Sequence, residues 1–226
     1  MKISNQILVI TIAAICACFI MINFKLRAEY KKGNIQSSVK KIILPTFHHI
    51  KELKSDKKEE YAYLPIININ QHSDSSILTY HFYSPIGYKY FVENDTLFLK
   101  RDSNTEGGLP VINLYCNNLK SISSIESRIT VHHYQTDSLQ LTSQNNSTIE
   151  CVALKNKYLN ITATNKSAII LSAIDTIQKS TIKVLNNAEL KLSDAFFKSY
   201  ALNIDSTATI STTGKSLKGL NARDFD

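Results

Sequence analysis

Small residues recur in this 226-residue chain at an almost constant spacing of 20 or 21 positions, and no other feature constrains the fold as much. The column of small residues is Ser127, Ser147, Ser167, Ala188 and Ala208. An aliphatic residue follows each of them two positions later, which gives a second column of Ile129, Ile149, Ile169, Leu190 and Ile210. A fixed period near 20 is typical of architectures built from stacked repeats.

Each repeat also contains a short apolar pattern that reads as a strand with alternate residues facing inward. Its members are Leu139 and Leu141, Leu159 and Ile161, Ile182 and Val184, and Leu202 and Ile204. Asn and Asp, which favour turns, lie between the two patterns. The sequence therefore predicts an all-β right-handed parallel β-helix with coils of about 20 residues. A β-sandwich with coincidental spacing is the alternative, because it also has short strands and frequent turns.

An apolar run near the N-terminus predicts one transmembrane helix in front of the β-domain. Residues 7–24 are interrupted only by Thr11 and Asn23, and about 18 residues suffice to cross hydrocarbon. A cleaved secretory signal and a lipoprotein processed before Cys18 are the alternatives. The positive-inside rule alone would place the C-terminal side in the cytoplasm, because Lys25, Arg27, Lys31 and Lys32 follow the run. Long domains translocate largely regardless of flanking charge, so we expect a single-pass inner-membrane protein with its C-terminal domain in the periplasm.

The net charge of +7 is concentrated next to this run. Residues 25–60 carry ten basic and five acidic side chains, whereas residues 61–226 are almost neutral, so nothing indicates a nucleic-acid partner. The predicted organisation is a tail at 1–6, an anchor at 7–24, a basic linker at 25–41, a β-helix domain at 42–220 and a tail at 221–226. Within the domain, 42–108 form first coils or a cap and 109–220 form regular coils.

Beyond the apolar run, ordered motifs occur at residues 47–50, 92–99, 109–114, 119–122 and 202–206. In this order they resemble the exported proteins of Bacteroidetes-type bacteria in the "putative auto-transporter adhesin, head GIN domain" family. The resemblance spans roughly residues 42–212. It implies a right-handed β-helix outside the cytoplasm, with no established activity.

The function that we expect is non-catalytic: adhesion, scaffolding or partner binding at the cell envelope. The alternative is a carbohydrate-active β-helix enzyme, either a lyase or a hydrolase. Glycoside cleavage needs two neighbouring carboxyl groups, and Asp175 and Asp194 are the one acidic pair near the coil spacing. Their sequence surroundings are typical of turns, so we expect no catalytic residues.

Neither a cofactor nor a metal is expected. The doublets His48–His49 and His132–His133 cannot chelate one ion from a single strand, because adjacent side chains point to opposite faces. Cys116 and Cys151 fit inward-facing strand positions. A disulfide between them is possible, but the sequence does not establish it.

Exposed aromatic side chains on strands can bind sugars or partner proteins, although packing in the core is the more ordinary role. The candidate binding surface is Tyr80, Phe82, Tyr83, Tyr88, Tyr90 and Phe91. The partners that we expect are a membrane, through the N-terminal helix, and an unidentified protein or glycan. The oligomeric state and the capping of the C-terminal end stay open.

Overall fold

The computed structural model describes residues 3–31, 39–54, 64–72, 75–81, 88–101, 111–213 and 216. The chain divides into two compact units, Met1–Ser38 and Val39–Asp226. The predicted tails at 1–6 and 221–226 and the predicted linker at 25–41 fall partly or wholly outside the described residues.

The first unit contains one helix, α1 (Ile3–Lys31), which confirms the predicted N-terminal apolar helix. A helix of 29 residues is about 43 Å long, which exceeds the hydrocarbon thickness of a bilayer. Its segment Thr11–Glu29 is long and apolar enough to cross a membrane, and none of that segment is buried within the protein. A signal sequence has the same length and composition.

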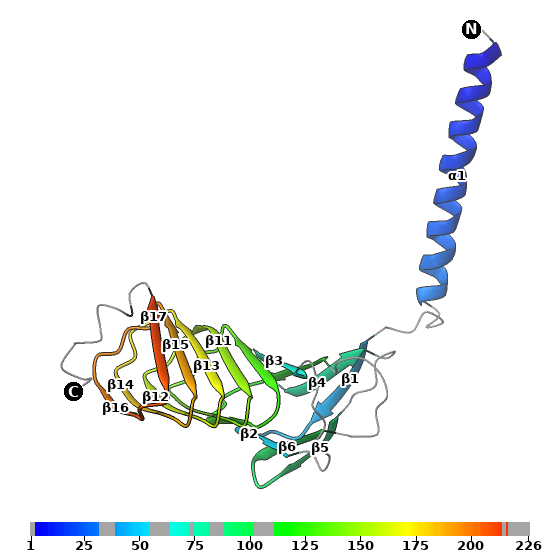
Figure 1. Cartoon of the computed structure of the whole chain (residues 1–226). Coiled ribbons are helices and arrows are strands. Elements are labelled where there is room, and N and C mark those ends of the chain that lie inside the picture. The colour runs from blue at the N-terminus through cyan, green and yellow to red at the C-terminus, as the bar shows by residue number, and fades with distance from the viewer. Residues whose placement is uncertain are drawn as a thin grey trace. The chain divides into compact units, whose positions relative to one another are not determined.

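The second unit consists of strands arranged in two sheets (Figure 1). The strands are β1 (Val39–Leu44), β2 (His49–Leu53), β3 (Ile66–Gln71), β4 (Ser76–His81), β5 (Tyr88–Glu93), β6 (Thr96–Arg101), β7 (Val111–Cys116), β8 (Ser121–Ser124), β9 (Arg128–His132), β10 (Ser138–Gln144), β11 (Thr148–Leu154), β12 (Tyr158–Thr164), β13 (Ala168–Ala173), β14 (Lys179–Leu185), β15 (Glu189–Ser193), β16 (Tyr200–Ile204) and β17 (Thr209–Thr213).

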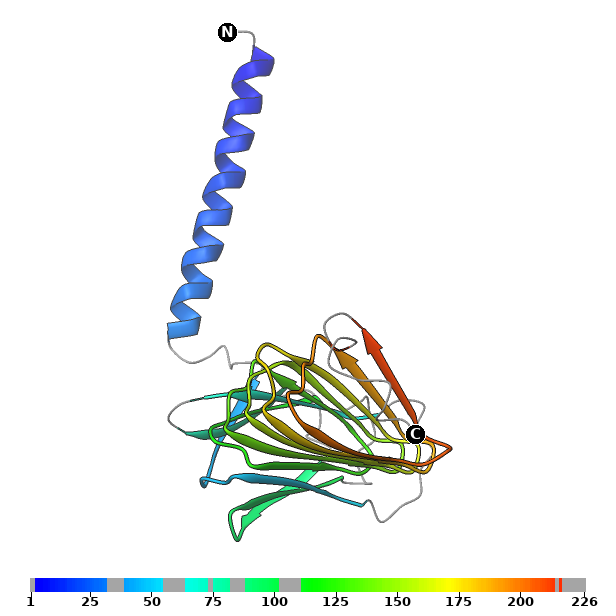
Figure 2. The same ribbon diagram turned by 90° about the vertical axis from the view of Figure 1, so that its left-hand side faces the viewer.

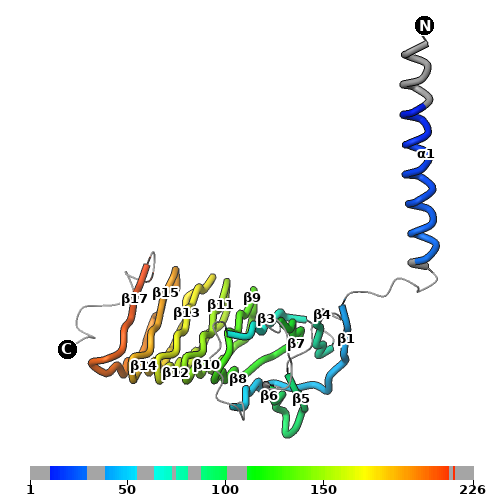
Figure 3. Tube along the Cα trace, turned by 45° about the vertical axis from the view of Figure 1, so that its right-hand side comes forward, coloured from blue at the N-terminus to red at the C-terminus, as the bar shows by residue number. Residues whose placement is uncertain are grey.

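Nine strands form the first sheet, in the order β1-β4-β7-β3-β9-β11-β13-β15-β17. Eight strands form the second, in the order β16-β14-β12-β10-β8-β2-β6-β5. From β8 to β17 the chain alternates between the two sheets, and Figures 2 and 3 show these strands lying side by side. Side chains that alternate inward along the strands form one hydrophobic core.

The predicted right-handed parallel β-helix is wrong. The fold is all-β, with 60% strand and 12% helix, and both of its sheets are mixed. The pairs β1–β4 and β4–β7 in the first sheet and β5–β6 in the second are antiparallel. The strand order also departs from the chain order, since β2 lies between β6 and β8 while β3 lies between β7 and β9. The spacing of 20 starts only near Ser127, so it carries no information about these earlier strands.

The aliphatic column lies along one row of the nine-stranded sheet. Ile129, Ile149, Ile169, Leu190 and Ile210 are consecutive partners in the parallel pairs from β9 to β17. The first four of these side chains are fully buried, and Ile210 packs against the same core. A register shift of one residue would turn every one of these side chains to the other face, so burial fixes the register.

The small-residue column lies where the chain turns from the second sheet into the first. The hydroxyl of Ser147 donates to the carbonyl of Ser124 at 3.1 Å, and the hydroxyl of Ser167 donates to that of Ser143 at 2.7 Å. Asparagines at the adjacent turns have positive φ, for example 53° at Asn145. Asn tolerates this left-handed region, which lets the chain reverse within a few residues. Small buried side chains and asparagines therefore shape this corner.

Candidate functional site

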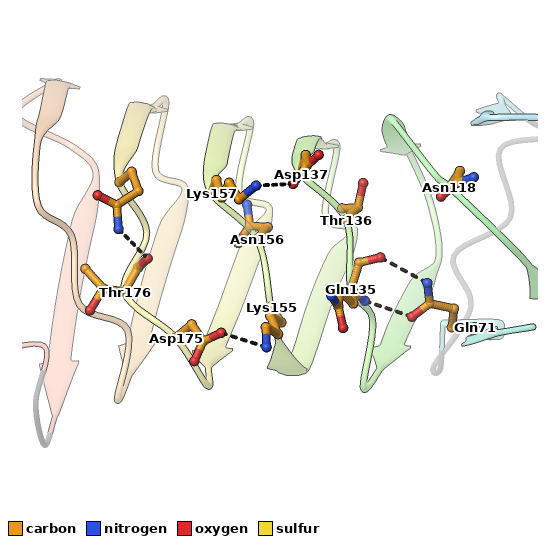
Figure 4. A pocket seen from close by; sticks show the side chains of 11 residues that line it. Gln71, Asn118, Gln135, Thr136, Asp137, Lys155, Asn156, Lys157, Asp175 and Thr176 are labelled. Carbon is orange, nitrogen blue, oxygen red and sulfur yellow. Dashed lines mark hydrogen bonds and ion pairs between the residues drawn. The ribbon is translucent and has the colours of Figure 1, made fainter.

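A polar groove of about 580 Å³ runs across the segments that return from the nine-stranded sheet to the eight-stranded one (Figure 4). All of its lining side chains are polar or charged: Gln71, Asn118, Gln135, Thr136, Asp137, Lys155, Asn156, Lys157, Asp175, Thr176 and Gln178. They come from the end of β3 and from the segments after β7, β9, β11 and β13. The groove is therefore built from five segments that lie far apart in the sequence.

Left-handed backbone at the ends of the first-sheet strands turns the chain into the groove. Asn118, His133 and Ala153 have φ values of 54°, 48° and 58°. At Ala153 the pairing of β11 with β13 shifts register, which marks a bulge two residues before Lys155. Bulges commonly redirect side chains in this way. The local backbone thus directs the segment that begins at Lys155 toward the groove.

Backbone hydrogen bonds hold the groove segments beside one another. The amide of Thr136 donates to the carbonyl of Lys155 at 3.0 Å, and the amide of Lys155 donates to that of Tyr134 at 2.9 Å. On the next segment, the amide of Gln178 donates to the carbonyl of Lys157 at 2.9 Å. The groove floor is a continuation of the strand ladder, so its side chains are spaced by the stacking of the strands.

Two ion pairs cross between segments. Lys157 Nζ lies 2.9 Å from Asp137 Oδ1, and Lys155 Nζ lies 3.2 Å from Asp175 Oδ2. The hydrogen bond to Asp137 raises the pKa of Lys157. All four side chains are substantially exposed, so the pairs contribute little to stability. Together they leave the groove with both hydrogen-bond donors and acceptors but no net charge.

Amide side chains supply the remaining fixed contacts. Gln71 brackets the backbone of Gln135: its Nε2 donates to the Gln135 carbonyl, and its Oε1 accepts from the Gln135 amide, both at 3.0 Å. Asn156 is only 4% exposed, and its Nδ2 donates to the carbonyl of Tyr158 at 2.9 Å. Its Oδ1 is buried and accepts no hydrogen bond from any described residue. Asn156 therefore carries a buried acceptor that has no donor among the described residues.

The aromatic residues predicted as a binding surface are distributed over both sheets. Tyr80 is half-buried on β4, and on β5 Tyr88 is buried while Tyr90 is half-buried. Phe91 is 46% exposed and stacks on Phe98 with their ring centroids 4.9 Å apart. Phe82 and Tyr83 lie outside the described residues. None of the four described aromatics lines the polar groove.

Asp175 and Asp194, the acidic pair considered for catalysis, do not both line the groove. Asp175 lines the groove and bonds to Lys155, whereas Asp194, at φ 57°, is not among the lining residues. Among the described carboxyl groups, burial raises the pKa of Glu52, but this side chain is enclosed by the turn after β8. The carboxyl with the raised pKa is thus not in the groove.

The histidines have ordinary partners. His48 Nδ1 lies 2.7 Å from Asp95 Oδ1, and His49 Nδ1 lies 2.7 Å from the hydroxyl of Ser121. Hydrogen bonding to His48 lowers the pKa of Asp95. No group of three potential metal ligands occurs within the part of the chain that the structure describes.

Cys116 and Cys151 are buried free thiols on β7 and β11. These strands are separated in the sheet by β3 and β9, which corresponds to about 14 Å at the usual strand spacing. A disulfide needs Cα atoms within about 7 Å, so this architecture does not allow the pair to bridge.

The sequence analysis did not predict this groove, although the residues that line it follow the same spacing as the core residues. Gln135, Lys155 and Asp175 are 20 positions apart, as are Thr136, Asn156 and Thr176. Polar columns of this kind are also what any solvated turn would show. Only the buried position of Asn156 and the hollow that these side chains line distinguish the groove from such a turn.

Solved structures similar to this fold include proteins described as adhesins. A "putative adhesin" from Bacteroides fragilis NCTC 9343 has a TM-score of 0.50 and 14% identity, over 77% of this chain and 96% of that chain. A "putative adhesin" from Parabacteroides merdae ATCC 43184 has a TM-score of 0.38 and 11% identity, over 78% and 96%. A "putative lipid binding protein" from Parabacteroides distasonis ATCC 8503 has a TM-score of 0.35 and 12% identity, over 78% and 96%.

No family model and no curated protein matches the sequence. At these low identities the B. fragilis structure is evidence for the fold alone, and the two weaker similarities carry no argument. Membership of the head GIN domain family is not shown.

Proposed function

We propose that this chain is a non-catalytic, adhesin-like protein that binds a partner at the cell envelope through its polar groove. The observation that carries the proposal is the hollow of about 580 Å³ lined by polar side chains from neighbouring segments. A backbone ladder keeps these side chains in place, so a ligand would meet a largely preformed surface. The names of the structural neighbours point to the same class of role.

The proposed location is the inner membrane, with the β-domain in the periplasm. The length and apolar composition of α1 suit a membrane anchor, and the basic residues that follow it favour contact with anionic headgroups. The domains proposed from the sequence are an anchor at 7–24, a linker at 25–41 and a β-domain from 42 to 220, although α1 extends to Lys31 and β1 begins at Val39.

The groove supports binding better than glycoside cleavage. A general acid has to be protonated when the substrate is bound, and it must converge with a second carboxylate. Asp137 and Asp175 each pair with a lysine, at 2.9 and 3.2 Å, and not with a second carboxyl group. Both carboxylates are therefore better suited to accepting hydrogen bonds from a ligand than to proton transfer.

Adherence of spheroplasts, from which the outer membrane has been removed so that the periplasmic domain is exposed, tests this proposal. Spheroplasts producing the full chain are allowed to settle on surfaces coated with gastric mucin, dextran or fibronectin, and retained spheroplasts are counted. We expect retention on at least one coating, and we expect the double variant Gln135→Ala/Lys155→Ala to reduce it at least about fivefold.

The matched control is Gln140→Ala/Lys183→Ala, which removes the same residue types from exposed positions on β10 and β14, outside the groove. Antibody staining confirms equal amounts of each variant. Adherence that is absent on every coating, or equal for groove and control variants, would contradict the proposed function.

A further inference from the structure

We infer that the ligand of the polar groove is an uncharged oligosaccharide that lies across the stacked segments. This inference rests on the proposed function, because it assigns a ligand class to the groove described above.

The charge of the groove argues against a polyanion. Its two lysines are paired with its two aspartates at 2.9 and 3.2 Å, and the other lining side chains are amides and hydroxyls. Nucleic acids and acidic polysaccharides are held by clefts with an excess of positive charge. A ligand that carries no net charge fits this lining best.

The chemistry of the lining favours hydroxyl groups over peptide side chains. No apolar residue is among the lining residues, whereas bound peptides usually place some side chains in apolar pockets. Amide and hydroxyl side chains both donate and accept hydrogen bonds, and so do sugar hydroxyls.

Asn156 lies among these lining side chains, but it offers no open contact to a ligand. Its Nδ2 donates to the Tyr158 carbonyl, while its buried Oδ1 accepts no hydrogen bond from the described residues. Because Oδ1 has almost no accessible surface, a ligand reaches it only if the side chain turns, so the inference does not depend on this atom.

Polar side chains recur from one segment to the next, although their chemistry differs. Gln135, Lys155 and Asp175 follow β9, β11 and β13 at intervals of 20 residues, and the segments are spaced as neighbouring strands, about 4.8 Å apart. Figure 4 shows these side chains spread over successive strands. The volume of about 580 Å³ accommodates a ligand of a few sugar units, which would meet polar side chains on each segment.

Calorimetric titration of the full chain in lipid nanodiscs tests the inference. The probes are cellohexaose, maltohexaose, mannohexaose and chitohexaose, with hexagalacturonate and a capped, uncharged decapeptide for comparison. We expect at least one neutral hexasaccharide to bind. Gln135→Ala/Lys155→Ala should weaken that binding at least about tenfold, as the loss of two hydrogen bonds predicts. Gln140→Ala/Lys183→Ala should change it less than about twofold.

The outcomes separate this inference from the proposed function. If only hexagalacturonate or only the peptide binds, and the groove variant loses that binding, the ligand is not a neutral glycan. The groove would still be supported as a binding site. Hexasaccharide binding that the groove variant leaves unchanged would overturn the assignment of the ligand to this groove. If no probe binds, the inference fails, and the adherence experiment decides the proposed function independently. Equal thermal unfolding of the two double variants excludes misfolding as the cause of any difference.

Discussion

The Oε2 atom of Glu52 accepts a hydrogen bond of 2.7 Å from the hydroxyl of Ser127, which lies 75 positions later in the chain. The same oxygen accepts from the Ser124 hydroxyl at 3.1 Å and from the amides of Ile125 and Glu126 at 2.8 and 3.2 Å. The Glu52 side chain is 2% exposed. A single carboxyl oxygen therefore joins β2 to the turn between β8 and β9.

Replacing Glu52 should destabilise the β-domain strongly. Glu52→Ala leaves several buried donors unpaired and should lower the free energy of unfolding by about 3 kcal/mol. Glu52→Gln retains an acceptor and should cost about 1 kcal/mol. Urea unfolding of the full chain in detergent, followed by far-UV circular dichroism, measures both values. Glu93→Gln, at an exposed position, is the control and should change stability by less than about 0.5 kcal/mol. A Glu52→Ala variant as stable as this control would contradict the assigned role.

The contribution of Glu52 should also depend on pH. Burial raises the pKa of Glu52 above its ordinary value of 4.5, despite the hydrogen bonds that lower it. Above pH 4.5 the unfolded state releases this proton before the folded state does. The contribution of Glu52 to the free energy of unfolding is therefore complete below pH 4.5. It declines as the pH rises through the pKa of Glu52 in the folded state.

The difference in unfolding free energy between the natural chain and Glu52→Gln, measured from about pH 4 to about pH 8, isolates this effect. Groups that titrate equally in both proteins cancel, including Asp95, whose lowered pKa gives the opposite pH dependence. The difference should fall as the pH rises, and a difference that grows with pH would refute the assignment.

The two core thiols should be unreactive until the domain unfolds. Burial raises the pKa of both Cys116 and Cys151 to about 12, so only about one thiol in ten thousand is ionised at pH 8. In a Cys16→Ser/Cys18→Ser variant, Ellman's reagent should find almost no thiol in the folded protein and two after denaturation without reductant. Finding none after denaturation would demonstrate a disulfide and contradict the strand order.

The orientation across the membrane is tested by reporter fusions after Phe225. If the β-domain is periplasmic, alkaline phosphatase fused there should be active and β-galactosidase should be inactive, since long domains translocate regardless of flanking charge. The reverse pattern would place the domain in the cytoplasm. A shortened chain on an immunoblot would instead indicate cleavage of the N-terminal segment.

The register of the C-terminal strands could be read from the sequence because each column residue packs on its own equivalent. Ile149, for example, pairs with Ile129 on one side and Ile169 on the other. The complete architecture could not be read in this way. The place of β2 between β6 and β8 depends on long-range contacts such as that of Glu52 with Ser127. No local sequence pattern predicts contacts of this kind.

The groove illustrates a different limit of sequence reasoning. Lys155, Asn156 and Lys157 read as an exposed turn, and two of the three side chains are indeed exposed. The burial of Asn156 follows from the bulge at Ala153 and from the neighbouring segments, which only the folded chain brings together.

Photo-crosslinking on intact cells tests the central claim, that the polar groove is the binding surface, most directly. A benzophenone amino acid replaces either Gln135, in the groove, or Gln140, on the exposed face of β10. The account predicts a crosslinked product of higher mass for position 135 and none for position 140. Crosslinking at position 140 alone, at both positions equally, or at neither would contradict it.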